Sequence, residues 1–184
     1  MPLIKTIAPE NAEGIIKEGY SMFMKNIGII PKPMEMMSAS PALFEQNLKR
    51  IHYYSTHPTL SFALLAHIRY LSAHHLDYRF CMDFNKAVLK KQGVEEADFQ
   101  KMEADPSESL LEENENAMLA FVINAIKSPG SVTKNDIQKL KDLGWEERDM
   151  VDALAQGVSM IDHSIMMQVF QIDTNCMVSD SSAG

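Results

Sequence analysis

Cysteine and long apolar runs are both scarce in this chain of 184 residues. The two cysteines, Cys81 and Cys176, stand far apart and form no metal-type cluster, and without evidence of export both are expected to be reduced thiols. No uninterrupted apolar run approaches the roughly 20 residues that span a bilayer. The first residues lack the basic segment and the apolar stretch of a signal peptide. We therefore expect a cytoplasmic protein with no membrane partner.

Positive charge is also in short supply, because 17 lysines and arginines face 25 aspartates and glutamates, giving a formal net charge of −8. An acidic surface repels phosphate backbones and no basic stripe interrupts it, so nucleic acid is not an expected partner. A Gly-x-Ser-x-Gly nucleophile elbow and a glycine-rich phosphate loop are missing as well. Their absence argues against a serine hydrolase and against a nucleotide-dependent enzyme.

Apolar residues recur at helical spacing along nearly the whole chain, and no stretch shows the sustained alternation of a strand. The sequence predicts an all-α bundle of about seven to nine helices. We expect a single domain over residues 1–184, with an ordered core over about 10–172 and a flexible tail over 174–184. Residues 29–33, which contain two prolines, are predicted to be an extended loop. The predicted helices begin near Pro9, Pro41, Ser61, Phe80, Val94, Leu111, Lys134 and Glu146.

The densest group of reactive side chains lies between positions 67 and 85, at the end of one predicted helix and the start of the next. If a helix begins near Phe80, Cys81 lies in its first turn, where the partial positive charge favours a thiolate. Tyr78, Cys81 and Asn85 have the spacing of neighbours on one helical face. His67 and His74 complete the set of candidate catalytic residues. The alternative is that Cys81 is an inert, buried, small apolar residue.

A metal site is a second interpretation of the same segment. His67 and His74 are seven residues apart, so both can face one cavity, with Asp77 or Cys81 as a further ligand and His163 within possible reach. The i, i+4 pair of histidines that is typical of helical zinc sites is absent. Histidines near a helix end more often bind backbone carbonyls, so we expect neither a metal nor a cofactor.

The segment around Cys81 resembles the carboxymuconolactone decarboxylase and alkyl hydroperoxidase D-like superfamily, in particular its peroxidase-related branch. Members commonly carry Cys-x-x-Cys, then a hydrophobic residue, often Asp, then His, Asn or Gly, on a helix that ends at Gly. The resemblance covers roughly residues 10 to 172. The stretches that carry it are Tyr78–Gly93, Gly28–Pro31, Met36–Pro41 and Gly144–Met150.

The resemblance implies a role for each matching position. Cys81 matches the second cysteine of the motif, which attacks the peroxide, whereas Tyr78 occupies the position of the first, resolving cysteine. Asn85 stands where many members have His, and the Glu expected upstream falls at residues 65–67, where no carboxylate is found. His67 or His74 is then the candidate general base. Cys176 is a candidate distant resolving cysteine.

These departures leave a one-cysteine cycle as the expected function, that of an antioxidant oxidoreductase in which Cys81 reduces a hydroperoxide and an external thiol restores it. The alternative is a non-redox member of the superfamily, either a small-molecule enzyme of the decarboxylase type or an inactive binding or structural oligomer. The resemblance also implies a homo-oligomer, from a dimer to a hexamer.

Overall fold

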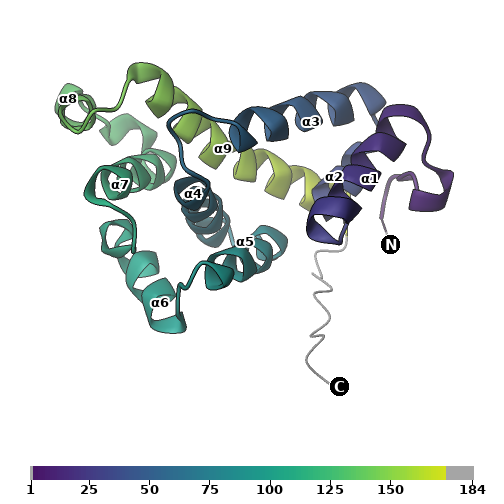
Figure 1. Ribbon diagram of the computed structural model, residues 1–184, viewed down its shortest axis with the longest axis horizontal. Helices are drawn as coiled ribbons and strands as arrows, with labels where there is room; N and C mark the ends of the chain where they lie inside the picture. Colours follow the sequence, from purple (N-terminus) through teal and green to yellow (C-terminus); the bar gives the residue numbers. More distant parts are fainter. Residues whose placement is uncertain (1, 173–184) are drawn as a thin grey trace. The chain divides into compact units, whose positions relative to one another are not determined.

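Helices make up the regular structure in the computed structural model, which describes residues 2–172, and this part of the chain contains no strand (Figure 1). The all-α prediction is confirmed. The predicted flexible tail and Cys176 lie outside the described residues. The helices are α1 (Gly14–Ile27), α2 (Lys32–Met37), α3 (Pro41–Ser55), α4 (Phe62–His75), α5 (Arg79–Lys91), α6 (Glu96–Ala104), α7 (Glu113–Lys127), α8 (Lys134–Asp142) and α9 (Glu147–Val169), with 3-10 turns η1 (Pro9–Asn11), η2 (Pro106–Glu108) and η3 (Pro129–Ser131).

Contacts between residues divide the described chain into two compact units. The first contains residues 2–58 and 165–172, and the second contains residues 59–164. The expectation of a single domain stays a prediction. Among residues 2–172, no helix is both long enough and apolar enough to cross a membrane.

The first unit is built on the packing of α1 against α3. Gly19 of α1 allows this close approach, because a Cβ atom there would lie 2.5 Å from a carbon of the Phe44 ring. Tyr20 packs edge-on against the same ring, with 5.8 Å between ring centroids. Its hydroxyl donates a hydrogen bond to the carbonyl of Ile7 at 2.9 Å and so connects the N-terminal segment to α1.

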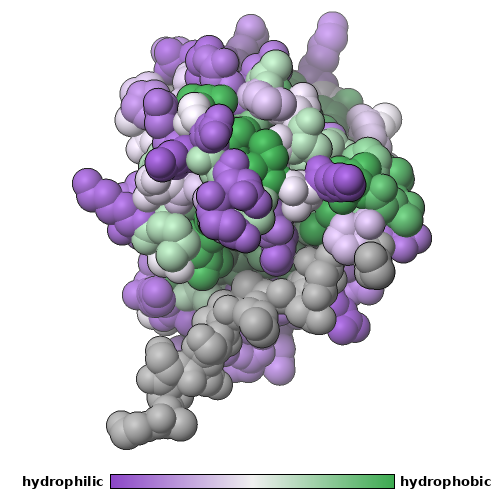
Figure 2. All heavy atoms as spheres, turned by 90° about the vertical axis from the view of Figure 1, so that its right-hand side faces the viewer, coloured by the Kyte–Doolittle hydropathy of each residue, from purple (hydrophilic) through white to green (hydrophobic). Residues whose placement is uncertain are grey.

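Figure 2 shows apolar side chains gathered in patches between charged ones on one face of the molecule.

Helix α4 is the central element of the second unit and packs extensively against α5 and also against α7. It begins close to the predicted start, where the Ser61 side chain caps the helix by accepting a hydrogen bond from the backbone N–H of Leu64 at 3.0 Å. Most of its residues are buried, as expected for a helix that is apolar on nearly every side. It ends at His75 with Leu76 as the C-cap residue, and Asp77, with a φ of 49°, turns the chain into α5.

Two predicted boundaries are wrong at the N-terminal end. The first long helix begins at Gly14 instead of Pro9, because residues 9–11 form the separate turn η1. The segment predicted as extended over residues 29–33 becomes helical from Lys32. Pro33 is the second residue of α2, where a missing N–H costs no intrahelical hydrogen bond. Burial of Met34, Met36 and Met37 on this short helix favours it over an extended chain.

Candidate functional site around Cys81

Cys81 is the third residue of α5, in the first turn, as predicted. Its side chain carries a thiol and is buried, with 6% of its surface exposed. The backbone N–H groups of a first turn have no partners within the helix, and together with the helix dipole they favour a negative charge nearby. The local backbone therefore favours the thiolate form of this side chain.

Arg69 of α4 contributes a cation to the surroundings of Cys81. Its Nε donates a hydrogen bond to Oδ1 of Asn85 at 2.9 Å, and Asn85 Nδ2 donates to the carbonyl of Cys81 at 2.8 Å. Burial lowers the pKa of Arg69 to about 10, and the nearby Cys81 acts in the opposite direction. The guanidinium is therefore still charged at neutral pH and is close enough to Cys81 for the two to interact electrostatically.

This guanidinium has an amide for a partner where a carboxylate would be usual. Within residues 2–172, Arg69 forms no ion pair with Asp or Glu. Arg69 is partly buried, and a cation withdrawn from water without a counter-ion is costly, so its positive charge is available to any anion that forms beside it. Cys81, as a thiolate, is such an anion.

Tyr78 lies beside Cys81 at the N-cap of α5 and is almost fully buried. Its hydroxyl makes no hydrogen bond to a nitrogen or oxygen atom of the described residues. Burial raises the pKa of Tyr78 far above its usual value, and the neighbouring Cys81 adds to this effect. The hydroxyl therefore keeps its proton and can donate a hydrogen bond to a negatively charged sulfur or oxygen.

His67 points to a different side of α4. Residues two apart on a helix project about 200° from each other, so His67 faces away from the side on which Arg69 meets α5. Its Nδ1 lies 2.8 Å from the carbonyl of Ala63, which can only accept, so Nδ1 carries the proton. Its Nε2 is buried and has no partner among the described residues. Burial lowers the pKa of His67, while the Ala63 carbonyl and the charge of Glu115 on α7 partly offset this.

His74 belongs to a third group of side chains, at the C-terminal end of α4. Its Nε2 lies 3.7 Å from Oε2 of Glu103 on α6, and the hydroxyl of Tyr70 donates a hydrogen bond to Oε1 of the same carboxylate. His74, His75 and Glu103 line a cavity of about 290 Å³. Of the five predicted catalytic residues, Tyr78, Cys81 and Asn85 are thus brought together. The roles proposed for His67 and His74 stay predictions.

The metal interpretation gains no support from the described residues. No group of three or more His, Cys, Asp or Glu side chains lies close enough to hold an ion in residues 2–172. His67 is neighbour to Glu115, His74 to Glu103, and Cys81 to Arg69. The two histidines thus lie near different carboxylates, two turns apart on α4, and Cys81 lies on α5.

Comparison with known proteins identifies the fold of this chain. No family model matches the sequence, and no curated protein matches it either. Solved structures do match. An uncharacterized peroxidase-related protein from Ralstonia eutropha, with an alkylhydroperoxidase AhpD core, superposes with a TM-score of 0.78 over 94% of this chain and 91% of its own. The fold is that of the alkylhydroperoxidase D core.

A second structure gives the same result. An uncharacterized peroxidase-related protein from Silicibacter sp. superposes with a TM-score of 0.75 over 94% of this chain and 88% of its own. Sequence identity is 14% to the first protein and 11% to the second. At such identities the likeness establishes the fold, and the chemistry has to be argued from the residues of this chain.

Proposed function

We propose that this protein is a thiol-dependent hydroperoxide reductase that uses Cys81 as its single redox-active cysteine. The observation that carries the proposal is the Arg69 guanidinium, which lies beside Cys81 without a carboxylate partner among the described residues. A cation and a helix N-terminus next to one thiol both favour the reactive thiolate. The AhpD-like fold of two peroxidase-related proteins is consistent with this chemistry.

In the first half of the cycle, the Cys81 thiolate attacks the terminal oxygen of a hydroperoxide. An S–O bond forms, the O–O bond breaks, and the leaving alkoxide takes a proton from water, so that the products are a sulfenic acid and an alcohol. Negative charge moves from sulfur to the leaving oxygen during this step. The Arg69 guanidinium and the Tyr78 hydroxyl are the donors that can stabilise this charge.

In the second half, an external thiol attacks the sulfenic sulfur, releases water and forms a mixed disulfide with Cys81. A second thiol attacks this disulfide, restores the Cys81 thiol and leaves with the first as a disulfide. The external reductant is needed because Tyr78 stands where the resolving cysteine of the motif is expected. Asn85 has a positioning role, since it links the guanidinium of Arg69 to the backbone of Cys81.

A specific observation favours a second candidate function. Cys81 is buried, and it does not line the cavity between α7 and α8, the cavity of His74 and Glu103, or the cavity beside Met150. A thiol that substrate does not reach would be an inert core residue. The protein would then be a non-redox member of the fold class that binds or converts a small molecule elsewhere, for example in the cavity of His74 and Glu103.

The experiment that separates the two functions treats the reduced protein with an organic hydroperoxide and traps sulfenic acid with dimedone, followed by peptide mass spectrometry. We expect the label at Cys81, loss of the label after treatment with a thiol before trapping, and no label at this position in Cys81→Ser. We expect Arg69→Gln to slow labelling by roughly tenfold or more, since it removes a charged donor.

Arg79→Gln is the matched control, because Arg79 lies two residues from Cys81 but is exposed. It should label at close to the wild-type rate. Circular dichroism of each variant verifies that α4 and α5 remain folded. An unlabelled Cys81 in the wild-type protein, or equal slowing by Arg69→Gln and Arg79→Gln, would refute the proposal and favour the second candidate.

A further inference from the structure

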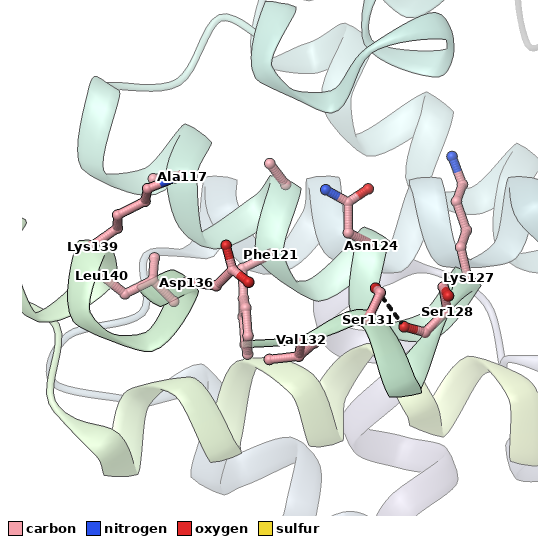
Figure 3. Close-up of a pocket in the computed structure, with 11 residues that line it drawn as sticks. Ala117, Phe121, Asn124, Lys127, Ser128, Ser131, Val132, Asp136, Lys139 and Leu140 are labelled. Atoms are coloured by element: carbon pink, nitrogen blue, oxygen red, sulfur yellow. Dashed lines mark hydrogen bonds between the residues drawn. The ribbon is translucent and has the colours of Figure 1, made fainter. Parts of the chain in front are cut away.

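A second cavity lies between α7, η3 and α8, at residues that take no part in the Cys81 site. It has a volume of about 420 Å³, within the range typical of small-molecule sites. Figure 3 shows the side chains around it. Phe121, Val132 and Leu140 supply apolar surface, while the charged groups in the lining are Lys127, Asp136 and Lys139.

The three charged side chains of this cavity are arranged with the negative one between the two positive ones. Lys139 and Lys127 stand at opposite ends of the group of side chains, and Asp136 lies between them (Figure 3). Neither lysine forms an ion pair with a described carboxylate, although Lys127 helps to lower the pKa of Asp105. Lys139 is close enough to Asp136 to help lower the pKa of that carboxyl group. The charges of the two lysines are available to an anionic ligand.

Asp136 is a fixed anion between these lysines. Its Oδ2 accepts hydrogen bonds from the backbone N–H of Thr133 at 2.9 Å and from the Thr133 hydroxyl at 2.7 Å, as part of the capping box at the start of α8. These bonds lower the pKa of Asp136, which therefore stays ionised at neutral pH. Its Oδ1 makes no hydrogen bond with the described residues and is left to accept one from a ligand.

The remaining polar groups are neutral. Ser131 donates its hydroxyl proton to the carbonyl of Ser128 at 2.7 Å, the bond drawn in Figure 3. Asn124 is exposed at the rim, and its side-chain amide forms no hydrogen bond with residues 2–172. A ligand that complements the whole arrangement has a negative charge at each end, a positive charge between or beside them, and methylene groups to contact the apolar surface.

We propose that this cavity binds an amino dicarboxylate, a small molecule with two carboxylates joined by a methylene chain that also carries an ammonium group. Lys127 and Lys139 each bind one carboxylate, and Oδ1 of Asp136 accepts a hydrogen bond from the ammonium. Phe121 and Val132 contact the methylene groups. Because the cavity shares no residue with the Cys81 site, the proposal is independent of the redox function.

Isothermal titration calorimetry with three six-carbon compounds tests the charge pattern. L-2-aminoadipate carries all three charges, adipate lacks the ammonium, and L-norleucine lacks the second carboxylate. At low ionic strength we expect L-2-aminoadipate to bind roughly two- to fivefold more tightly than either of the others, as the loss of one exposed charge pair implies. Equal affinities for the three compounds, or no saturable heat with any of them, would overturn the proposal.

Variants connect the binding to the residues. Lys139→Gln and Lys127→Gln should each weaken binding of L-2-aminoadipate by a similar factor. Asp136→Asn keeps an oxygen that can accept from Thr133, and it should remove the preference for L-2-aminoadipate over adipate. Lys134→Gln is the control, because Lys134 is an exposed lysine on the same helix that does not line the cavity. If this control weakens binding as much as Lys139→Gln does, the attraction is a general charge effect and the proposed site is wrong.

Discussion

Arg69 is the residue that most changes the chemistry expected near Cys81. In the sequence it is a single arginine within the apolar stretch 64–71, and such a side chain often extends its charge to solvent from the edge of a core. The structure instead directs it to Asn85 on α5. The positive charge that this chain has near its cysteine therefore comes from α4, a helix on which the sequence suggested only histidines.

The buried side chain of His67 predicts how the stability of the fold depends on pH. Its pKa is lowered from 6.5 in the folded protein, so the unfolded chain binds a proton more readily than the folded one. The stability that this difference represents is fully present above pH 6.5, and it is lost as the pH falls from there through the lower pKa of the folded state. We expect His67→Leu to lose less stability over this range than the wild type.

Urea denaturation between neutral pH and about pH 5 measures the effect. At neutral pH the His67→Leu variant should lie within about 1 kcal/mol of the wild type, because the lost Ala63 contact is offset by removal of the unpartnered Nε2. Parallel pH profiles for the two proteins would show that His67 is not the buried base described here.

The candidate site was predictable from the sequence only where helix periodicity governs it. The spacing of Tyr78, Cys81 and Asn85 predicted neighbours on one turn, and the structure places them together. His67 was included because it is near in sequence, but 3.6 residues per turn send it to the side of α4 that faces α7. Contacts between helices, such as that of Arg69 with Asn85, depend on packing that one sequence does not reveal.

The packing of α1 against α3 depends on a glycine. Gly19 lies inside α1, where alanine is the better helix former by about 1 kcal/mol. A Cβ atom at this position would nevertheless lie 2.5 and 2.6 Å from two carbons of the Phe44 ring and 3.1 Å from Leu48. We expect Gly19→Ala to destabilise the protein by about 1–3 kcal/mol, because the buried ring has to move.

Thermal or urea unfolding checks this prediction. Gly130→Ala is the control, since a Cβ atom at Gly130 meets nothing within 4 Å and the backbone there has no positive φ. It should change the free energy of unfolding by less than about 1 kcal/mol. A Gly19→Ala variant more stable than the wild type would mean that α1 and α3 are packed less closely than described.

Helix termini show how far local rules predict the elements. Ser61 and the Thr133–Asp136 pair cap α4 and α8 as their residue types predict. The rule that disfavours helix before proline predicts a loop at Pro31 and Pro33, yet α2 begins between them. There the burial of three methionines outweighs the local preference.

At the scale of the whole molecule, the homo-oligomer implied by the family resemblance is still a prediction. Helix α9 offers a surface for it, because Val151 and Val158 lie seven residues apart on one helical face and are 66% and 44% exposed. We expect light scattering to give a mass above that of one chain, and Val158→Lys to lower it.

Val88→Lys is a suitable control, because this residue is only partly exposed and lies on α5 instead of α9. The oligomer should be unchanged in this variant as long as its circular dichroism is that of the wild type. A wild-type protein with the mass of a single chain would contradict the prediction.

The most direct test of the redox function is the rate at which Cys81 of the intact wild-type protein is oxidised by hydrogen peroxide near neutral pH, followed by mass spectrometry. An activated thiolate beside Arg69 should react at least about a hundredfold faster than free cysteine, and Arg69→Gln should remove most of this advantage. A rate equal to that of free cysteine, unchanged by Arg69→Gln, would contradict the account and identify Cys81 as an inert residue of the core.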